Sequence, residues 1–325
     1  MPFIKESSYT KAPFFLRTGH WETIYPAIVR KVRGIKYQRE RLELKDGDFV
    51  DLDWIKKGSQ KLILLMHGLE GNTERHYMKG MAKKFNQQNW DVLAMNCRSC
   101  SGEMNRKMRL YNHGEIEDIG EVIDHALRQN NYQELTLVGF SMGGSIILKY
   151  LGVNGGQHPK QIKSAVAFST PVDLHGSVAK LDEPECAFYK KRFMSMLHDK
   201  IKYKAEKYPG VMDFNNMKKV KIWKDFDNYF SAPLNGYKNA DDFYTQASAI
   251  NFMSGIQIPA LLVNAQNDPI LTPTCFPVDF AKEHQHIYLE MPKKGGHVGF
   301  SSWGKTFAWS EERAWEFVNK KHSSN

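Results

Sequence analysis

Six short apolar runs, separated by segments with helical spacing, constrain the fold of this chain more than any other feature. The runs are residues 61–66, 91–95, 134–140, 162–168, 259–264 and 287–290. Apolar side chains at residues 116–127 recur at the spacing of an amphipathic helix. Before the first run, residues 40–54 alternate apolar and polar side chains around Asp46-Gly47, which predicts an antiparallel hairpin. Because strands that alternate with helices form a sheet covered on both faces, we expect an α/β fold with a mostly parallel sheet.

One connection is far longer than the others. The 87 residues 171–257 separate the fourth run from the fifth, which exceeds the usual length of a loop or a single helix. Helical spacing inside this segment predicts a helix near 185–207 that ends before Pro209-Gly210. We therefore expect a helical insertion of residues 171–257 in a core formed by residues 1–170 and 258–325.

The composition places the chain among ordinary globular proteins. It has 325 residues, of which 42% are hydrophobic and 25% are charged, so a large core can form. No stretch approaches the roughly 18 apolar residues of a membrane span. The first residues lack the apolar segment of a secretory signal, and we expect a cytoplasmic protein.

The net charge of +9 is concentrated in one part of the chain. Residues 186–225 hold eleven Lys and Arg side chains against four Asp and Glu, a net charge of +7. We expect most of these lysines to lie on a solvated outer helix face. The alternative is a basic surface that attracts anionic amphiphiles or an anionic lipid surface, and we expect no nucleic-acid partner.

Residues 139–143 form the motif GxSxG, with Ser141 at its centre. The motif follows the predicted strand ELTLVGF and opens the predicted helix MGGSIILKYLG. A nucleophile elbow has this arrangement, because a sharp turn from strand to helix raises the serine hydroxyl above the sheet. The sequence therefore predicts Ser141 as a nucleophile.

A serine nucleophile needs a histidine base and usually a carboxylate, which in such folds follow in the order Ser, Asp, His. Asp268 follows the strand PALLVNA and His297 follows the strand HIYLEMP, so both are expected at the carboxyl edge of the sheet. Asp173 follows the preceding strand and competes for the acid role, although it also suits a helix cap. We favour the triad Ser141, Asp268 and His297.

The turn HGLEG after the first run is expected to supply one backbone N–H to an oxyanion hole. The second N–H is expected from the residue that follows the nucleophile. Leu69 and Met142 are therefore the predicted donors.

Other candidate motifs carry less weight. His113 and Asp118 have HxxxxD spacing, which is sometimes associated with acyl transfer, but they lie at the start of a predicted helix, and we expect capping instead of catalysis. His284 and His286 could bind a metal, yet a surface strand is the better interpretation. Four cysteines are expected to be buried thiols, not a zinc site or disulfides: Cys97, Cys100, Cys186 and Cys275.

Several motifs together resemble one family. They are, in order, APFFLRTGHWETIYP, DGDFVDLDW, HGLEG, NCRSCSGE, GFSMGGS, STPVDL, NDP and GGHVGF. Over roughly residues 12–320 the chain resembles the YheT-like branch of the α/β-hydrolase superfamily. The resemblance implies an α/β-hydrolase core with a helical cap, a triad at Ser141, Asp268 and His297, and esterase activity. Some relatives act on phospholipids or form esters as acyltransferases. The sequence departs from the family pattern at Ser99 and at residues 111–114.

These observations predict a serine carboxylesterase that forms an acyl-enzyme on Ser141 and needs no metal or organic cofactor. The expected substrate is a small-molecule ester with a short to medium acyl chain, since aromatic residues of the insertion can line its pocket. Transfer of the acyl group to an alcohol and (phospho)lipase activity are alternatives on the same triad. A lipid-binding protein on a hydrolase scaffold is an alternative of another class.

Overall fold

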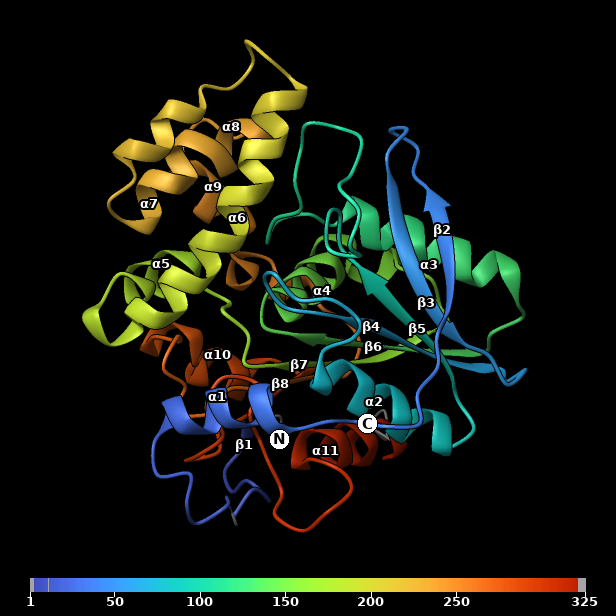
Figure 1. The fold of residues 1–325 in the computed structure, drawn as a ribbon. Helices are drawn as coiled ribbons and strands as arrows, with labels where there is room; N and C mark the ends of the chain where they lie inside the picture. Colours follow the sequence, from blue (N-terminus) through green and yellow to red (C-terminus); the bar gives the residue numbers. More distant parts are fainter. Residues whose placement is uncertain (1–2, 11, 321–325) are drawn as a thin grey trace.

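One mixed sheet forms the centre of the computed structural model, which describes residues 3–10 and 12–320 (Figure 1). The order of its strands is β1-β9-β8-β7-β6-β4-β5-β3-β2. Their bounds are β1 Phe3–Ile4, β2 Gln38–Glu43, β3 Phe49–Ile55, β4 Lys61–Met66, β5 Asp91–Asn96, β6 Glu134–Phe140, β7 Ile162–Phe168, β8 Ala260–Val263 and β9 Ile287–Glu290. All neighbours pair in parallel except β2 with β3 and β3 with β5. The six predicted strands and the predicted hairpin are confirmed.

The central strands are buried because helices cover both faces of the sheet. On one face lie α3 (Glu117–Gln129) and α4 (Met142–Asn154). Their apolar side chains pack in one cluster with the side chains of β4 and β6 that point to this face. On the other face lie α2 (His76–Gln87) and α11 (Trp309–Asn319). This double cover explains why the strands read as unbroken apolar runs in the sequence.

The segment after β7 forms a group of helices with an apolar cluster of its own, drawn at the upper left of Figure 1. These helices are α5 Leu174–Leu181, α6 Ala187–Lys207, α7 Trp223–Phe226, a π-helical turn Asp227–Ser231, α8 Ala232–Leu234 and α9 Ala240–Ala247. The chain then returns to the sheet at β8, and α10 (Val278–Glu283) leads to β9. The predicted long helix near 185–207 is confirmed by α6.

The first helix, α1 (Gly19–Val29), is not among the predicted elements. It contains Pro26, which usually ends a helix, and its first turn is capped by the side chain of Thr18. No helix of the described residues is both long and apolar enough to span a bilayer. A cytoplasmic location stays a prediction. The four cysteines are buried free thiols, as expected.

Candidate active site

Ser141 lies in the sharp turn between β6 and α4. Its backbone has φ 53° and ψ −121°, a conformation that side-chain-bearing residues rarely adopt. The neighbouring glycines allow this turn, because a Cβ at Gly139 would lie 2.4 Å from the carbonyl oxygen of Gly143. A Cβ at Gly143 would lie 2.6 Å from the carbonyl oxygen of Met66 on β4. The small residues of the motif are thus a steric requirement of the elbow.

The three side chains of the predicted triad lie within hydrogen-bond distance of one another. The hydroxyl of Ser141 is 2.9 Å from Nε2 of His297. Nδ1 of His297 is 2.9 Å from Oδ2 and 3.2 Å from Oδ1 of Asp268. A carboxylate can only accept here, so Nδ1 carries the proton and Nε2 is left to accept from the serine. This arrangement can deprotonate Ser141 as it attacks a carbonyl carbon.

Both loops that carry the histidine and the acid are fixed by neighbouring segments. The backbone N–H of His297 donates to the hydroxyl of Thr23 on α1, at 2.8 Å. Asp268 is buried and also accepts the N–H of Ile270 at 2.9 Å. The competing acid Asp173 caps α5 instead, where its side chain accepts the N–H groups of His175 and Gly176. Its expected cap role is confirmed.

The two predicted oxyanion donors belong to the segments that flank the serine. Leu69 lies in the turn after β4, and Met142 is the first residue of α4, where backbone N–H groups have no partner within the helix. A Cβ at Gly68 would lie only 3.0 Å from Cβ of Ser141, so glycine lets this turn approach the serine. The positions suit a pair of donors beside the hydroxyl, and the role of each stays a prediction.

A buried cluster around Glu70 holds this turn, and sequence reasoning missed it. Glu70 has φ 51°, and its N–H donates to the hydroxyl of Tyr111 at 2.9 Å. The same hydroxyl donates to Oε1 of Glu70, which also accepts from Nζ of Lys200 at 2.7 Å. Arg75 donates to the carbonyl oxygen of Glu70 at 2.9 Å. Lys200 belongs to α6, so the insertion contacts the residue next to Leu69.

A cavity of about 330 Å³ opens beside the triad. Side chains of α1 and α6 form much of its wall, among them Ile28, Phe188 and Phe193. Arg192 also lines it and has no acidic partner among the residues that the structure describes. The mostly apolar wall thus also carries charged groups. Arg30 is paired with Glu311 and Arg75 donates to the carbonyl oxygen of Glu70, whereas Arg192 is left for a ligand.

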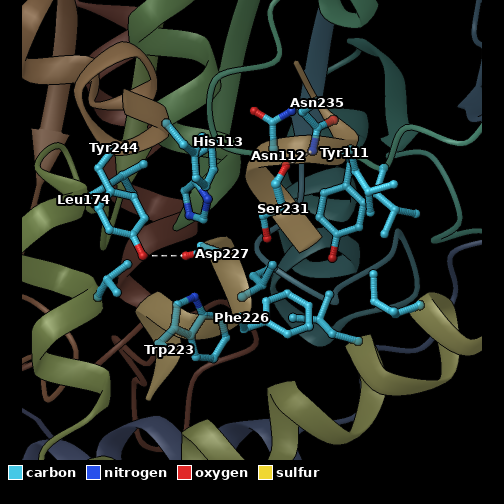
Figure 2. A pocket seen from close by; sticks show the side chains of 17 residues that line it. Tyr111, Asn112, His113, Leu174, Trp223, Phe226, Asp227, Ser231, Asn235 and Tyr244 are labelled. Carbon is cyan, nitrogen blue, oxygen red and sulfur yellow. Dashed lines mark hydrogen bonds between the residues drawn. The ribbon is translucent and has the colours of Figure 1, made fainter. Parts of the chain in front are cut away.

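A second, more enclosed cavity of about 60 Å³ lies between the insertion and the loop before α3 (Figure 2). Its wall is mostly apolar, and Leu69 lines both cavities. Burial lowers the pKa of His113 in this wall to about 4, so its ring is neutral at pH 7. Burial raises the pKa of Asp227 to about 6, and Tyr244 donates a hydrogen bond to it at 2.7 Å. The histidine of this wall is thus neutral, and its one carboxylate is held by a hydrogen bond.

The two residues of the HxxxxD spacing have separate roles in the structure. His113 lines the second cavity, whereas both oxygens of Asp118 accept from Arg98, at 2.6 and 2.7 Å. Asp118 lies in the first turn of α3, yet its side chain does not cap the helix. The expected capping role is therefore wrong, because a buried cation binds the carboxylate.

The pair His284 and His286 precedes β9, which is mostly buried between β1 and β8, so the expected surface strand is wrong. Nδ1 of His284 accepts the backbone N–H of His286 at 3.2 Å. Within the described parts of the chain, no group of three or more His, Cys, Asp or Glu side chains could hold a metal ion.

Most basic side chains of residues 186–225 are exposed, as expected. Lys191 and Lys202 are exposed on α6. Lys204, in contrast, is fully buried and donates to the carbonyl oxygen of Asn105 at 2.9 Å, and Lys200 contacts Glu70. These two lysines are exceptions to the solvated outer face, because they fasten α6 to the core.

Comparisons with known proteins agree with this geometry. A family model described as the α/β-hydrolase fold matches residues 61–302. "Putative esterase YheT" of Escherichia coli (strain K12) is 31% identical over 86% of this chain and 84% of its own length. Phospholipase ABHD3 of Mus musculus is 26% identical over 92% of this chain and 74% of its own length. A solved esterase structure from Pyrococcus furiosus has a TM-score of 0.58 at 17% identity, with 87% of this chain and 90% of that chain covered, which shows a shared fold.

Proposed function

Because the chain belongs to the α/β-hydrolase family, in the branch that includes the YheT protein, we propose that it hydrolyses carboxylic esters through an acyl-enzyme on Ser141. The observation that carries the proposal is the continuous hydrogen-bonded series from Ser141 through His297 to Asp268 beside an open cavity. The esterase and phospholipase names of the two relatives support the same class of reaction.

The proposed reaction has two halves. In the first, Oγ of Ser141 attacks the ester carbonyl carbon while Nε2 of His297 takes the hydroxyl proton. The oxyanion accepts hydrogen bonds from the N–H groups of Leu69 and Met142, and the ester C–O bond then breaks as His297 returns the proton to the leaving alcohol. In the second half, His297 deprotonates a water molecule that attacks the acyl carbon. The bond between the acyl carbon and Oγ of Ser141 then breaks as His297 returns the proton to Oγ, which leaves a carboxylic acid and free Ser141.

In this proposal, residues 171–257 act as a cap over a core of residues 1–170 and 258–325. The support is that Phe188 and Phe193 of α6 line the same cavity as the serine. A cavity of about 330 Å³ suits a short to medium acyl chain better than a long one.

One observation favours a narrower class of substrate. Arg192 lines the catalytic cavity without an acidic partner in the described chain, so it can bind an anionic group on the substrate. Esters that carry a phosphate or carboxylate, including phospholipids, are therefore the second candidate substrates. Transfer of the acyl group to an alcohol would use the same first half-reaction.

Hydrolysis of a nitrophenyl ester series from acetyl to palmitoyl tests the proposal, with Ser141→Ala as the blank. We expect turnover to be highest for short and medium chains and to vanish in the blank. Equal turnover by Ser141→Ala would refute the assignment, and a folded wild-type protein that is inactive on every ester would favour a lipid-binding protein.

A further inference from the structure

Helix α1 turns its apolar side chains outward. Trp21, Ile28 and Val29 are 59%, 71% and 51% exposed. The one Asp, Glu, Lys or Arg in this helix, Glu22, is only 2% exposed and accepts from Asn267 at 2.8 Å and from the N–H of Gly295 at 2.7 Å. A surface helix usually shows the opposite pattern, with its charges in water. The exposed face of α1 is thus apolar and carries no charge.

This face belongs to a larger apolar surface. Phe15 contacts Tyr25 of α1 at a ring-centroid distance of 5.3 Å, and it also contacts Phe14 and Trp303. We use the term apolar rim for six exposed side chains: Phe14, Trp21, Ile28, Val29, Phe188 and Trp303. Clusters of exposed large apolar side chains on soluble domains usually mark an interaction site.

The apolar rim borders the entrance to the catalytic cavity. Ile28 of α1 and Phe188 of α6 line the cavity that contains Ser141, and they are 71% and 57% exposed. Figure 1 shows α1 in blue on the outside of the core, below the insertion in this view. A partner that covers the apolar rim would therefore lie directly at the entrance used by the substrate.

Positive charge flanks the part of the apolar rim that α1 forms. Between residues 12 and 36 the chain has five Lys and Arg side chains and a single acid, the buried Glu22. Arg17, Lys31 and Arg33 are exposed and have no ion-pair partner among the described residues. Apolar side chains flanked by free cations match the chemistry of an anionic lipid surface, where rings and aliphatic groups enter the headgroup region and cations bind phosphates.

We propose that the apolar rim and these flanking cations dock the protein on an anionic lipid surface, with the entrance of the catalytic cavity facing the lipid. An ester held in that surface would then enter the cavity without exposing its chain to water. The docking step itself is independent of the proposed hydrolysis, whereas the delivery of a lipid ester rests on it. The inactive variant Ser141→Ala can therefore be used to measure docking alone.

Co-sedimentation with vesicles tests the docking step. The vesicles contain phosphatidylcholine alone or phosphatidylcholine with phosphatidylserine, and the protein carries Ser141→Ala. We expect binding to the anionic vesicles, which weakens as salt rises. Adding Trp21→Ser with Val29→Ser should weaken it roughly tenfold or more, because two inserted side chains are lost. The matched control, Val153→Ser with Val211→Ser, changes two exposed apolar residues outside the rim and should bind like its parent.

A second measurement separates docking from catalysis. In the active protein, Trp21→Ser with Val29→Ser should reduce hydrolysis of an ester embedded in anionic vesicles and leave kcat/KM for a soluble acetyl ester unchanged, since neither residue lines the cavity. Unchanged vesicle binding by this variant would overturn the proposal. So would a wild-type dimer in analytical ultracentrifugation that dissociates in the variant, because the rim would then be an interface between copies.

Discussion

Replacing Lys200 by methionine should impair both stability and catalysis, because this residue joins the insertion to the turn that carries Leu69. Its ammonium group donates to Glu70 at 2.7 Å, and the two side chains are only 12% and 3% exposed. Burial alone would lower the pKa of Lys200, but the adjacent Cys100 and Glu70 raise it, so the lysine is charged at pH 7. Methionine keeps most of the side-chain length and removes the charge.

The expected loss of stability depends on which hydrogen-bond partners Glu70 keeps in the variant. Removing one partner of a buried ion pair costs about 3–5 kcal/mol. Because the hydroxyl of Tyr111 still contacts Glu70, we expect the lower end, about 3 kcal/mol, in the free energy of unfolding. Loss of a whole oxyanion donor lowers kcat by about 10² to 10³. A displaced Leu69 N–H should weaken that bond only in part, so we expect kcat to fall by about tenfold to a hundredfold with a smaller change in KM.

Urea denaturation and steady-state kinetics on a soluble butyryl ester measure the two effects. Lys202→Met on the same helix is the matched control, since Lys202 is exposed and should tolerate the change. The double variant Lys200→Met with Glu70→Gln removes both charges and should recover part of the lost stability. A wild-type kcat in Lys200→Met would contradict the proposed link between Lys200 and the turn at Leu69. So would an equal loss of stability and kcat in Lys202→Met.

Three further predictions concern the acids and the buried arginine. Asp268→Asn should lower kcat by about 10⁴, because the histidine loses the partner that sets its tautomer. Asp173→Asn should leave kcat unchanged, since asparagine caps a helix equally well. Measuring ester hydrolysis by both variants shows which aspartate is the acid of the triad. Arg98→Met should lower the free energy of unfolding in urea by about 3–5 kcal/mol, since the buried carboxylates of Asp48 and Asp118 and the partly exposed Asp46 share this guanidinium. Burial opposes ionisation of Asp48, but hydrogen bonds from Asn105 and from backbone N–H groups hold its pKa at about 2, below its usual value of 3.8. Its stabilising contribution is therefore complete above pH 4 and is lost as the pH falls towards 2, so Asp48→Asn should flatten the acid side of a plot of Tm against pH.

The parts of the fold that the sequence predicts well are those that local patterns determine. The run KLILLM is continuously apolar because both faces of β4 are covered, so the pattern itself indicates a buried strand. Asp46-Gly47 forms the hairpin turn that its residue types favour. The turn at Ser141 is predictable for the same reason, since only glycine fits at residues 139 and 143. In each case the cause lies within a few residues of the feature.

Features that depend on distant partners could not be read from the sequence. Glu70 and Lys200 are separated by 130 residues, and no spacing rule joins a turn after one strand to a helix of the insertion. In the sequence, Asp118 stands where a helix-capping acid is expected, and only the structure shows that it binds Arg98. The outward apolar face of α1 was missed because Pro26 disfavours a helix and because burial of Glu22 depends on loops near the end of the chain.

Covalent labelling shows directly whether Ser141 is the nucleophile. A fluorophosphonate is incubated with the protein, and the modified peptide is located by mass spectrometry. We expect Oγ of Ser141 to displace fluoride from phosphorus, so that the adduct lies on Ser141 and ester hydrolysis stops in proportion to labelling. Ser141→Ala should be neither labelled nor active. An adduct on another residue, or continued ester hydrolysis by a protein fully labelled at Ser141, would contradict this assignment of the nucleophile.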